Sequence, residues 1–119
     1  MMARIFLVDD KPEIIALFKD LLELKGYHVI DSASDGEEAV LKYKKFKEKP
    51  DLVIMDHRMP SKDGLEATRE ILEFDPLAKI MFVSADESIK SKALESGSLA
   101  FKTKPIEMRP LLENVEKCL

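Results

Sequence analysis

Five short apolar runs alternate along the chain with longer amphipathic stretches, and this alternation limits the possible folds more than any other feature. Each run has the length of a β-strand and is rich in apolar or β-branched residues. The runs are residues 3–8, 27–31, 52–55, 79–83 and 98–102. The runs at 52–55 and 79–83 each contain four consecutive apolar residues, which is typical of parallel strands that are buried on both faces.

The stretches between these runs carry apolar residues at helical spacing. The spacing predicts helices around residues 14–22, 39–46, 65–72 and 111–119, and a weaker one over 87–95. Gly26 and Gly97 are placed to end the first and the fourth of these helices along the chain. Asp35 and Asp63 are placed as N-caps of the second and the third.

A strand followed by a helix, repeated five times, is the pattern of parallel strands joined by crossover helices. We therefore predict a doubly wound α/β fold in which five helices cover both faces of a five-stranded parallel sheet. We expect residues 1–119 to form one domain, because a chain of this length buries enough surface to fold without disulfides or a structural metal. Cys118 is the only cysteine, which excludes an intrachain disulfide and a cysteine-based zinc site.

The charge balance narrows the possible functions. The chain holds 19 Lys and Arg against 23 Asp and Glu, a formal net charge of -4. Proteins that hold a phosphate backbone carry a basic surface, so we expect no direct nucleic-acid binding. No apolar run approaches the roughly 18 residues of a membrane span, and a lone cysteine suits a reducing compartment. We expect a cytoplasmic protein without membrane contact.

Acidic residues collect where the predicted strands end. Asp9 and Asp10 follow the first strand, and Asp56 follows the third. The carboxyl ends of parallel strands meet at one edge of the sheet, where open α/β proteins bind ligands. Three carboxylates gathered there repel one another unless a cation lies among them, and oxygen ligands of this kind suit Mg2+. The sequence therefore predicts a magnesium site at this edge.

Two further polar groups come to the same edge. Ser84 follows the fourth strand, and Lys104 with Pro105 follows the fifth. A lysine and a hydroxyl beside a metal supply the charge neutralisation and the hydrogen bond that an incoming phosphoryl group needs. A carboxylate held among them is itself a nucleophile for aspartyl-phosphate chemistry. These residues predict a Mg2+-dependent phosphoaspartate site.

Several short sequence fragments, taken in their order and spacing along the chain, resemble the receiver domains of response regulators in two-component signalling. The resemblance covers essentially the whole chain. It rests on the acids at 9–10, LVIMDHRMP at 52–60 with Asp-Gly at 63–64, VSA at 83–85 and FKTKP at 101–105. It implies a flavodoxin-like sheet with strand order 2-1-3-4-5, as in single-domain regulators of the chemotaxis and sporulation type.

The resemblance implies a role for each acid. Asp56 would accept a phosphoryl group from a phosphohistidine on a sensor histidine kinase or a histidine phosphotransfer protein. Asp9, Asp10 and Asp56 would hold Mg2+ together with the backbone carbonyl of Arg58. The protein would catalyse only its own phosphorylation and dephosphorylation, so it would be a signalling switch rather than an enzyme.

The resemblance also implies how the switch would move. Lys104 would pair with the phosphoryl oxygens, Ser84 would close onto them, and the rotamer of Phe101 would follow. The peptide before Pro105 is expected to be cis. The face formed by the fourth helix, the fifth strand and the fifth helix would then control an output protein of unknown identity. We expect a monomer or a weak dimer.

Two charged residues in loops beside this site form a separate hypothesis. Arg58 lies two residues after the acceptor, and Asp86 lies two residues after Ser84. We predict that their side chains face each other across the phosphoryl group and obstruct the attacking water, so that hydrolysis is slow. His28, His57 and Lys62 are interpreted as structural or solvated residues.

Three alternatives remain open at this point. The chain resembles a complete single-domain protein, beginning with methionine and ending in a helix, but a receiver cut from a longer DNA-binding regulator would look the same. An aspartyl-phosphate phosphatase would need a second Asp where Arg58 stands. A flavin mononucleotide binder would need a loop rich in Ser, Thr or Gly after the first strand, where residues 9–13 read DDKPE.

Overall fold

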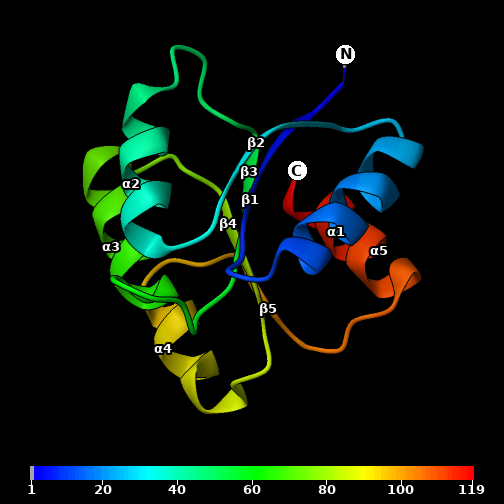
Figure 1. Cartoon of the computed structure of the whole chain (residues 1–119). Coiled ribbons are helices and arrows are strands. Elements are labelled where there is room, and N and C mark those ends of the chain that lie inside the picture. The colour runs from blue at the N-terminus through cyan, green and yellow to red at the C-terminus, as the bar shows by residue number, and fades with distance from the viewer. Residues whose placement is uncertain (1) are drawn as a thin grey trace.

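Five parallel strands form one central sheet in the order β2-β1-β3-β4-β5 in the computed structural model, which describes residues 2–119 (Figure 1). The strands are β1 (Arg4–Val8), β2 (His28–Ala33), β3 (Leu52–Met55), β4 (Ile80–Ser84) and β5 (Ala100–Thr103). Every neighbouring pair is parallel. The predicted doubly wound fold and its strand order are confirmed. Met1 lies outside the described residues.

Helices cover both faces of the sheet. They are α1 (Pro12–Leu24), α2 (Gly36–Lys45), α3 (Gly64–Phe74), α4 (Lys90–Glu95) and α5 (Met108–Cys118). Figure 1 shows α1 and α5 on one face, and α2, α3 and α4 on the other. The weakly patterned stretch over 87–95 contains a 3-10 turn, η1 (Glu87–Ile89), followed by the six-residue α4. No helix among residues 2–119 is long and apolar enough to cross a membrane.

Successive residues of each central strand feed two different cores. In β1, Phe6 and Val8 pack into the core under α2, α3 and α4, whereas Ile5 and Leu7 pack into the core under α1 and α5. All four side chains are almost fully removed from solvent. This two-sided burial is the physical reason why the central strands read as continuous apolar runs rather than as alternating ones.

Strand β2 extends two residues beyond the predicted end at Asp31. It lies at the edge of the sheet, so polar side chains near its end remain accessible to solvent. Lys42 of α2 donates hydrogen bonds to the Asp31 carboxylate (3.2 Å) and to the carbonyl oxygen of Ser32 (2.6 Å). The prediction ended too early because apolar pattern alone does not detect a polar continuation at a sheet edge.

The predicted helix ends are confirmed. Asp35 and Asp63 are the N-caps of α2 and α3, and each carboxylate accepts a hydrogen bond from the backbone N–H three residues later. Gly26 and Gly97 follow α1 and α4 with φ values of 100° and 110°. Only glycine adopts this left-handed conformation without a steric cost.

Helices α2 and α3 both begin with Asp-Gly, and both glycines lie against backbone. The N–H of Gly36 donates to the carbonyl oxygen of Lys62 (3.0 Å), and a Cβ on Gly36 would lie 2.2 Å from that oxygen. A Cβ on Gly64 would lie 2.1 Å from the carbonyl oxygen of Asp56. The loop between β3 and α3 is therefore held between two helix starts, directly beside the predicted phosphoryl acceptor.

Replacing Gly36 by alanine should lower the free energy of unfolding by about 1–3 kcal/mol, the usual cost of overpacking. Alanine is the better helix former by about 1 kcal/mol, so a net loss isolates the clash with the Lys62 carbonyl. Urea denaturation measures the change. Glu37→Ala, at the exposed next position, is the control and should cost no more than about 1 kcal/mol. Unchanged or increased stability of Gly36→Ala would contradict the contact.

Candidate functional site

The predicted site residues converge because the hydrogen-bond pattern of the sheet continues one residue past β1, β3 and β5. Beyond β1 and β3, the N–H of Asp9 donates to Ala33 (3.0 Å) and that of Asp56 to Val8 (2.9 Å). Beyond β5, the N–H of Lys104 donates to the carbonyl oxygen of Ser84 (2.9 Å). The side chains that follow the strands therefore start from a rigid backbone at one edge of the sheet.

Asp9, Asp10 and Asp56 form a cluster of carboxylates. One oxygen from each side chain lies within 4.8 Å of the others. Asp9 and Asp56 are 5% and 7% exposed, whereas Asp10 is half-buried. An all-oxygen donor set with two acids largely removed from water fits a small, hard divalent cation, which would offset their mutual repulsion.

Lys104, which follows β5, reaches into this cluster. Its Nζ lies 2.5 Å from Oδ2 of Asp9 and 3.3 Å from Oδ2 of Asp56. The lysine side chain is only 15% exposed. A buried ammonium is stabilised only when it is paired, so Lys104 and the two acids stabilise one another.

Burial raises the pKa of Asp56, and the nearby negative charge of Asp9 raises it further. Lys104 and the hydrogen bond from the backbone N–H of His57 (2.8 Å) act in the opposite direction. Burial and the neighbouring acid prevail. Asp56 therefore holds a proton more readily in the folded protein than in the unfolded chain.

Ser84 is the last residue of β4, and Phe101 lies in β5. The Ser84 hydroxyl is buried and accepts a hydrogen bond from the backbone N–H of Asp86 (3.1 Å). Phe101 is buried and stacks on Phe82, with ring centroids 6.2 Å apart and an interplanar angle of 23°. The peptide bond before Pro105 is cis, as expected.

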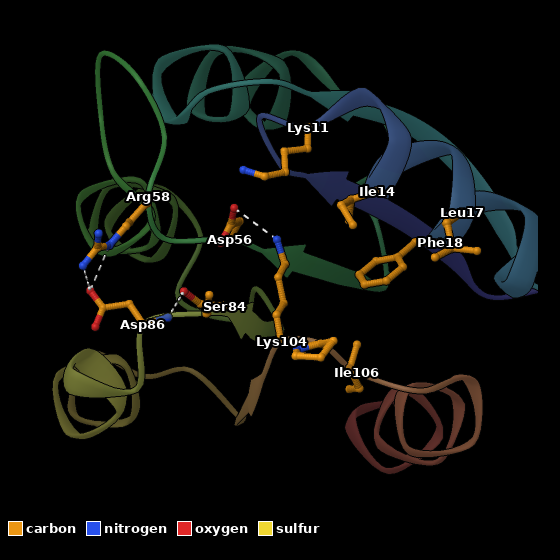
Figure 2. A pocket seen from close by; sticks show the side chains of 12 residues that line it. Lys11, Ile14, Leu17, Phe18, Asp56, Arg58, Ser84, Asp86, Lys104 and Ile106 are labelled. Carbon is orange, nitrogen blue, oxygen red and sulfur yellow. Dashed lines mark hydrogen bonds and ion pairs between the residues drawn. The ribbon is translucent and has the colours of Figure 1, made fainter.

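Arg58 and Asp86 contact each other beside Asp56, as Figure 2 shows. Nε and Nη2 of Arg58 both lie 3.3 Å from the same oxygen of Asp86. The arginine side chain is 80% exposed and the aspartate 14%. Hydrogen bonds from Ser88, with a smaller effect of Arg58, lower the pKa of Asp86. This pair bridges the β3–α3 and β4–α4 loops.

A cavity of about 390 Å³ opens beside Asp56, Ser84 and Lys104. One wall is apolar and comes from Ile14, Leu17 and Phe18 of α1 and from Pro105 and Ile106 (Figure 2). The sequence predicted a helix here but no cavity wall. The available signal was the number of apolar residues, because those over 14–22 exceed what one buried stripe needs, and Leu17 remains 49% exposed.

The residues interpreted as structural or solvated have the following surroundings. Lys62 pairs with Glu70 of α3, and His28 is exposed at the start of β2. The His57 side chain is 12% exposed, and its Nδ1 lies 4.0 Å from the Asp63 carboxylate. A different cation, Lys11, lines the cavity. Sequence reasoning passed over Lys11, although a lysine directly before a helix-starting proline is an unusual N-cap.

Comparison with known proteins gives consistent similarities. The response regulator receiver domain model matches residues 5–116. Protein CcdB of Bacillus subtilis is 39% identical over 120 residues, which cover 99% of this chain and 98% of the relative. Chemotaxis protein CheY of Thermotoga maritima is 37% identical over 116 residues, which cover 96% and 95%.

A solved structure shows the same fold. The crystal structure of the CheX–CheY–BeF3–Mg2+ complex from Borrelia burgdorferi matches with a TM-score of 0.92 and 32% sequence identity. The match covers 97% of this chain and 87% of that one. In that relative, the complex contains both Mg2+ and BeF3.

Replacing Asp56 by asparagine should stabilise the metal-free protein at neutral pH. Because folding raises the pKa of Asp56, wild-type stability should fall as the pH rises from about 3.9, the ordinary value for aspartate. The gain in Asp56→Asn should therefore be present at pH 7 and shrink toward pH 4. Thermal melting in a chelator measures it, with Asp20→Asn on the exposed side of α1 as the control. A wild type that is more stable than Asp56→Asn at pH 7 would refute the raised pKa.

Proposed function

Because the chain belongs to the response regulator receiver domain family, we propose that it is a signalling switch phosphorylated on Asp56. The observation that carries this proposal is the position of Asp56. It is buried at the end of β3, beside two further carboxylates and within 3.3 Å of the Lys104 ammonium. No second carboxylate is placed to act as an acid two residues later, since that position is Arg58.

In the proposed transfer, a carboxylate oxygen of Asp56 attacks the phosphorus of a phosphohistidine on a sensor kinase or phosphotransfer protein. The new O–P bond forms as the N–P bond breaks. The electron pair returns to the imidazole ring, whose other nitrogen carries a proton, so the ring leaves neutral. Mg2+ bound by Asp9, Asp10, Asp56 and the Arg58 carbonyl would neutralise charge on the phosphoryl oxygens.

Lys104 and Ser84 then act on the new phosphoryl group. Lys104 is already held between Asp9 and Asp56, so its ammonium needs only a small displacement to pair with a phosphoryl oxygen. The Ser84 hydroxyl donates to a second oxygen as the serine closes. Phe101 follows into the space behind it, and the face formed by α4, β5 and α5 changes its affinity for an output protein.

The alternatives differ in specific features. A receiver within a longer DNA-binding regulator would carry out the same phosphoryl chemistry, and the length of the intact reading frame distinguishes it. An aspartyl-phosphate phosphatase would turn over a chromogenic phosphomonoester. Flavin binding would need donor N–H groups in a Gly-rich or Ser-rich loop before α1, where the chain has acids and Pro12. We therefore favour the switch in cytoplasmic two-component signalling.

Incubation with a radiolabelled acyl phosphate and Mg2+ should label the wild-type protein. Asp56→Ala should remove the label, because it deletes the attacking oxygen, and a chelator should remove it from wild type. Asp20→Ala retains every residue of the cluster and should label like wild type. Undiminished labelling of Asp56→Ala, in a variant whose circular dichroism shows a folded chain, would refute the assignment.

We further propose that the pair of Arg58 and Asp86 slows hydrolysis of the phosphoaspartate. Both residues line the cavity beside Asp56, and they contact each other there. In this position they would cover the approach of water to the phosphorus. An exposed ion pair is worth at most about 1 kcal/mol, so the effect comes from occupying space rather than from strong binding.

Arg58→Ala and Asp86→Ala should each shorten the phosphoryl half-life, by about threefold to tenfold, which corresponds to about 1 kcal/mol in the barrier. The double variant should be little worse than either single variant, because the two side chains act as one obstruction. Acid quenching of the labelled protein at intervals gives the half-lives. Unchanged decay in both single variants would show that the pair is only a solvated contact.

A further inference from the structure

Lys11 occupies a position that disfavours lysine. It is the N-cap residue of α1, and its side chain makes no capping hydrogen bond. The corresponding positions of α2, α3 and η1 hold aspartates that do cap. A cation at this end of a helix also faces the positive end of the helix dipole. Lysine therefore costs α1 stability at a place where Ser or Asp would increase it.

The backbone at Lys11 is held in place while its side chain is free. Its N–H donates to Oδ1 of the buried Asp9 (2.9 Å), so the residue is tied to the acidic cluster. The exposed side chain lines the cavity that contains Asp56. In Figure 2 it extends from the start of α1 toward Asp56 and Arg58.

Three cationic side chains line this cavity, and two of them are neutralised. Lys104 is paired with Asp9 and Asp56, and Arg58 is paired with Asp86. Within residues 2–119, Lys11 has no carboxylate within 4.0 Å of its ammonium. It is therefore the cation at the cavity whose charge remains available to an incoming ligand.

We propose that Lys11 is a donor-binding residue, which attracts the doubly charged phosphoryl group of the donor into the cavity. This inference rests on the proposed function and adds a residue to it. Lys11 acts on the encounter with the donor, whereas Asp56 makes the bond. With acetyl phosphate as donor, an Asp56 oxygen attacks phosphorus, the P–O bond to the acetyl group breaks, and acetate leaves with the electron pair. No proton is transferred.

A role in donor binding explains both why lysine is tolerated at the N-cap of α1 and why the Lys11 ammonium lies at the cavity. Residues that break a local folding rule are expected at functional positions, where another requirement prevails. One positive charge about 6 Å from a dianion in water changes a binding constant by about tenfold, and salt screens the attraction. The effect should therefore depend on the charge of the donor and on ionic strength.

The test compares Lys11→Gln with wild type in the second-order rate constant for phosphorylation, at saturating Mg2+, by mass spectrometry of the intact protein. With acetyl phosphate, a dianion, the variant should be slower by about fivefold to tenfold at low salt. With phosphoramidate, a monoanion, it should be slower by only about twofold to threefold. Both differences should shrink near 1 M salt. Lys45→Gln, the same charge change on α2, should match wild type.

A second variant separates this role from damage to the fold. Lys11→Ser should raise the melting temperature, because serine caps α1, while phosphorylation by acetyl phosphate slows as in Lys11→Gln. Rates equal to wild type in both Lys11 variants would overturn the inference and leave the proposed function intact. A slowing that is equal for both donors and insensitive to salt would also overturn it. A wild type that neither donor phosphorylates would overturn the inference and the proposed function together.

Discussion

The structure depends on two carboxylates that are held side by side with little contact to water. Asp9 and Asp56 repel each other, and burial makes the repulsion stronger than it would be at a surface. Lys104 offsets part of the energetic cost of this repulsion. Hydrogen bonds from the backbone N–H groups of Lys11 and His57 offset a further part. The remaining repulsion would fall if a divalent cation bound among the carboxylates. The same repulsion, together with burial, raises the pKa of Asp56.

Keeping repelling groups together requires a rigid frame, and two features of the fold supply it. The parallel sheet fixes the starting point of each acid, because its hydrogen bonds continue through Asp9 and Asp56. The loop after Asp56 is then confined between the starts of α2 and α3, where Gly36 and Gly64 admit carbonyl oxygens that no other residue would accommodate. In each Asp-Gly pair, the aspartate caps a helix and the glycine leaves room for a carbonyl oxygen of the β3–α3 loop. The arrangement limits relaxation of the acids away from one another.

The sequence predicted the parts of the molecule in which one physical requirement dominates. Burial on both faces requires continuous apolar runs in β3 and β4, which made these strands easy to recognise. The acids that follow such strands could then be placed at one edge of the sheet. Prediction failed where a residue serves two requirements. Strand β2 was cut short because Asp31 is a strand residue whose side chain is also a partner of Lys42, and the polar Ser32 follows it at the edge of the sheet. Likewise, Ile14 and Leu17 belong to the apolar stripe of α1 and also to a cavity wall, a distinction that only tertiary placement reveals.

The β4–α4 loop links these requirements to the proposed output. The N–H of Asp86 donates to the Ser84 hydroxyl, while its carboxylate holds Arg58 and caps η1. One residue later, Glu87 accepts a hydrogen bond from Thr103 at the end of β5 (3.0 Å). Any movement of Ser84 toward Asp56 would alter its hydrogen bond from Asp86. Through Asp86, the movement would also alter the contact with Arg58 and the hydrogen bond between Glu87 and Thr103. Because α4 has only six residues, little helical structure resists such a change. Phosphoryl lifetime and switching would then share one short segment, so neither is adjustable without the other.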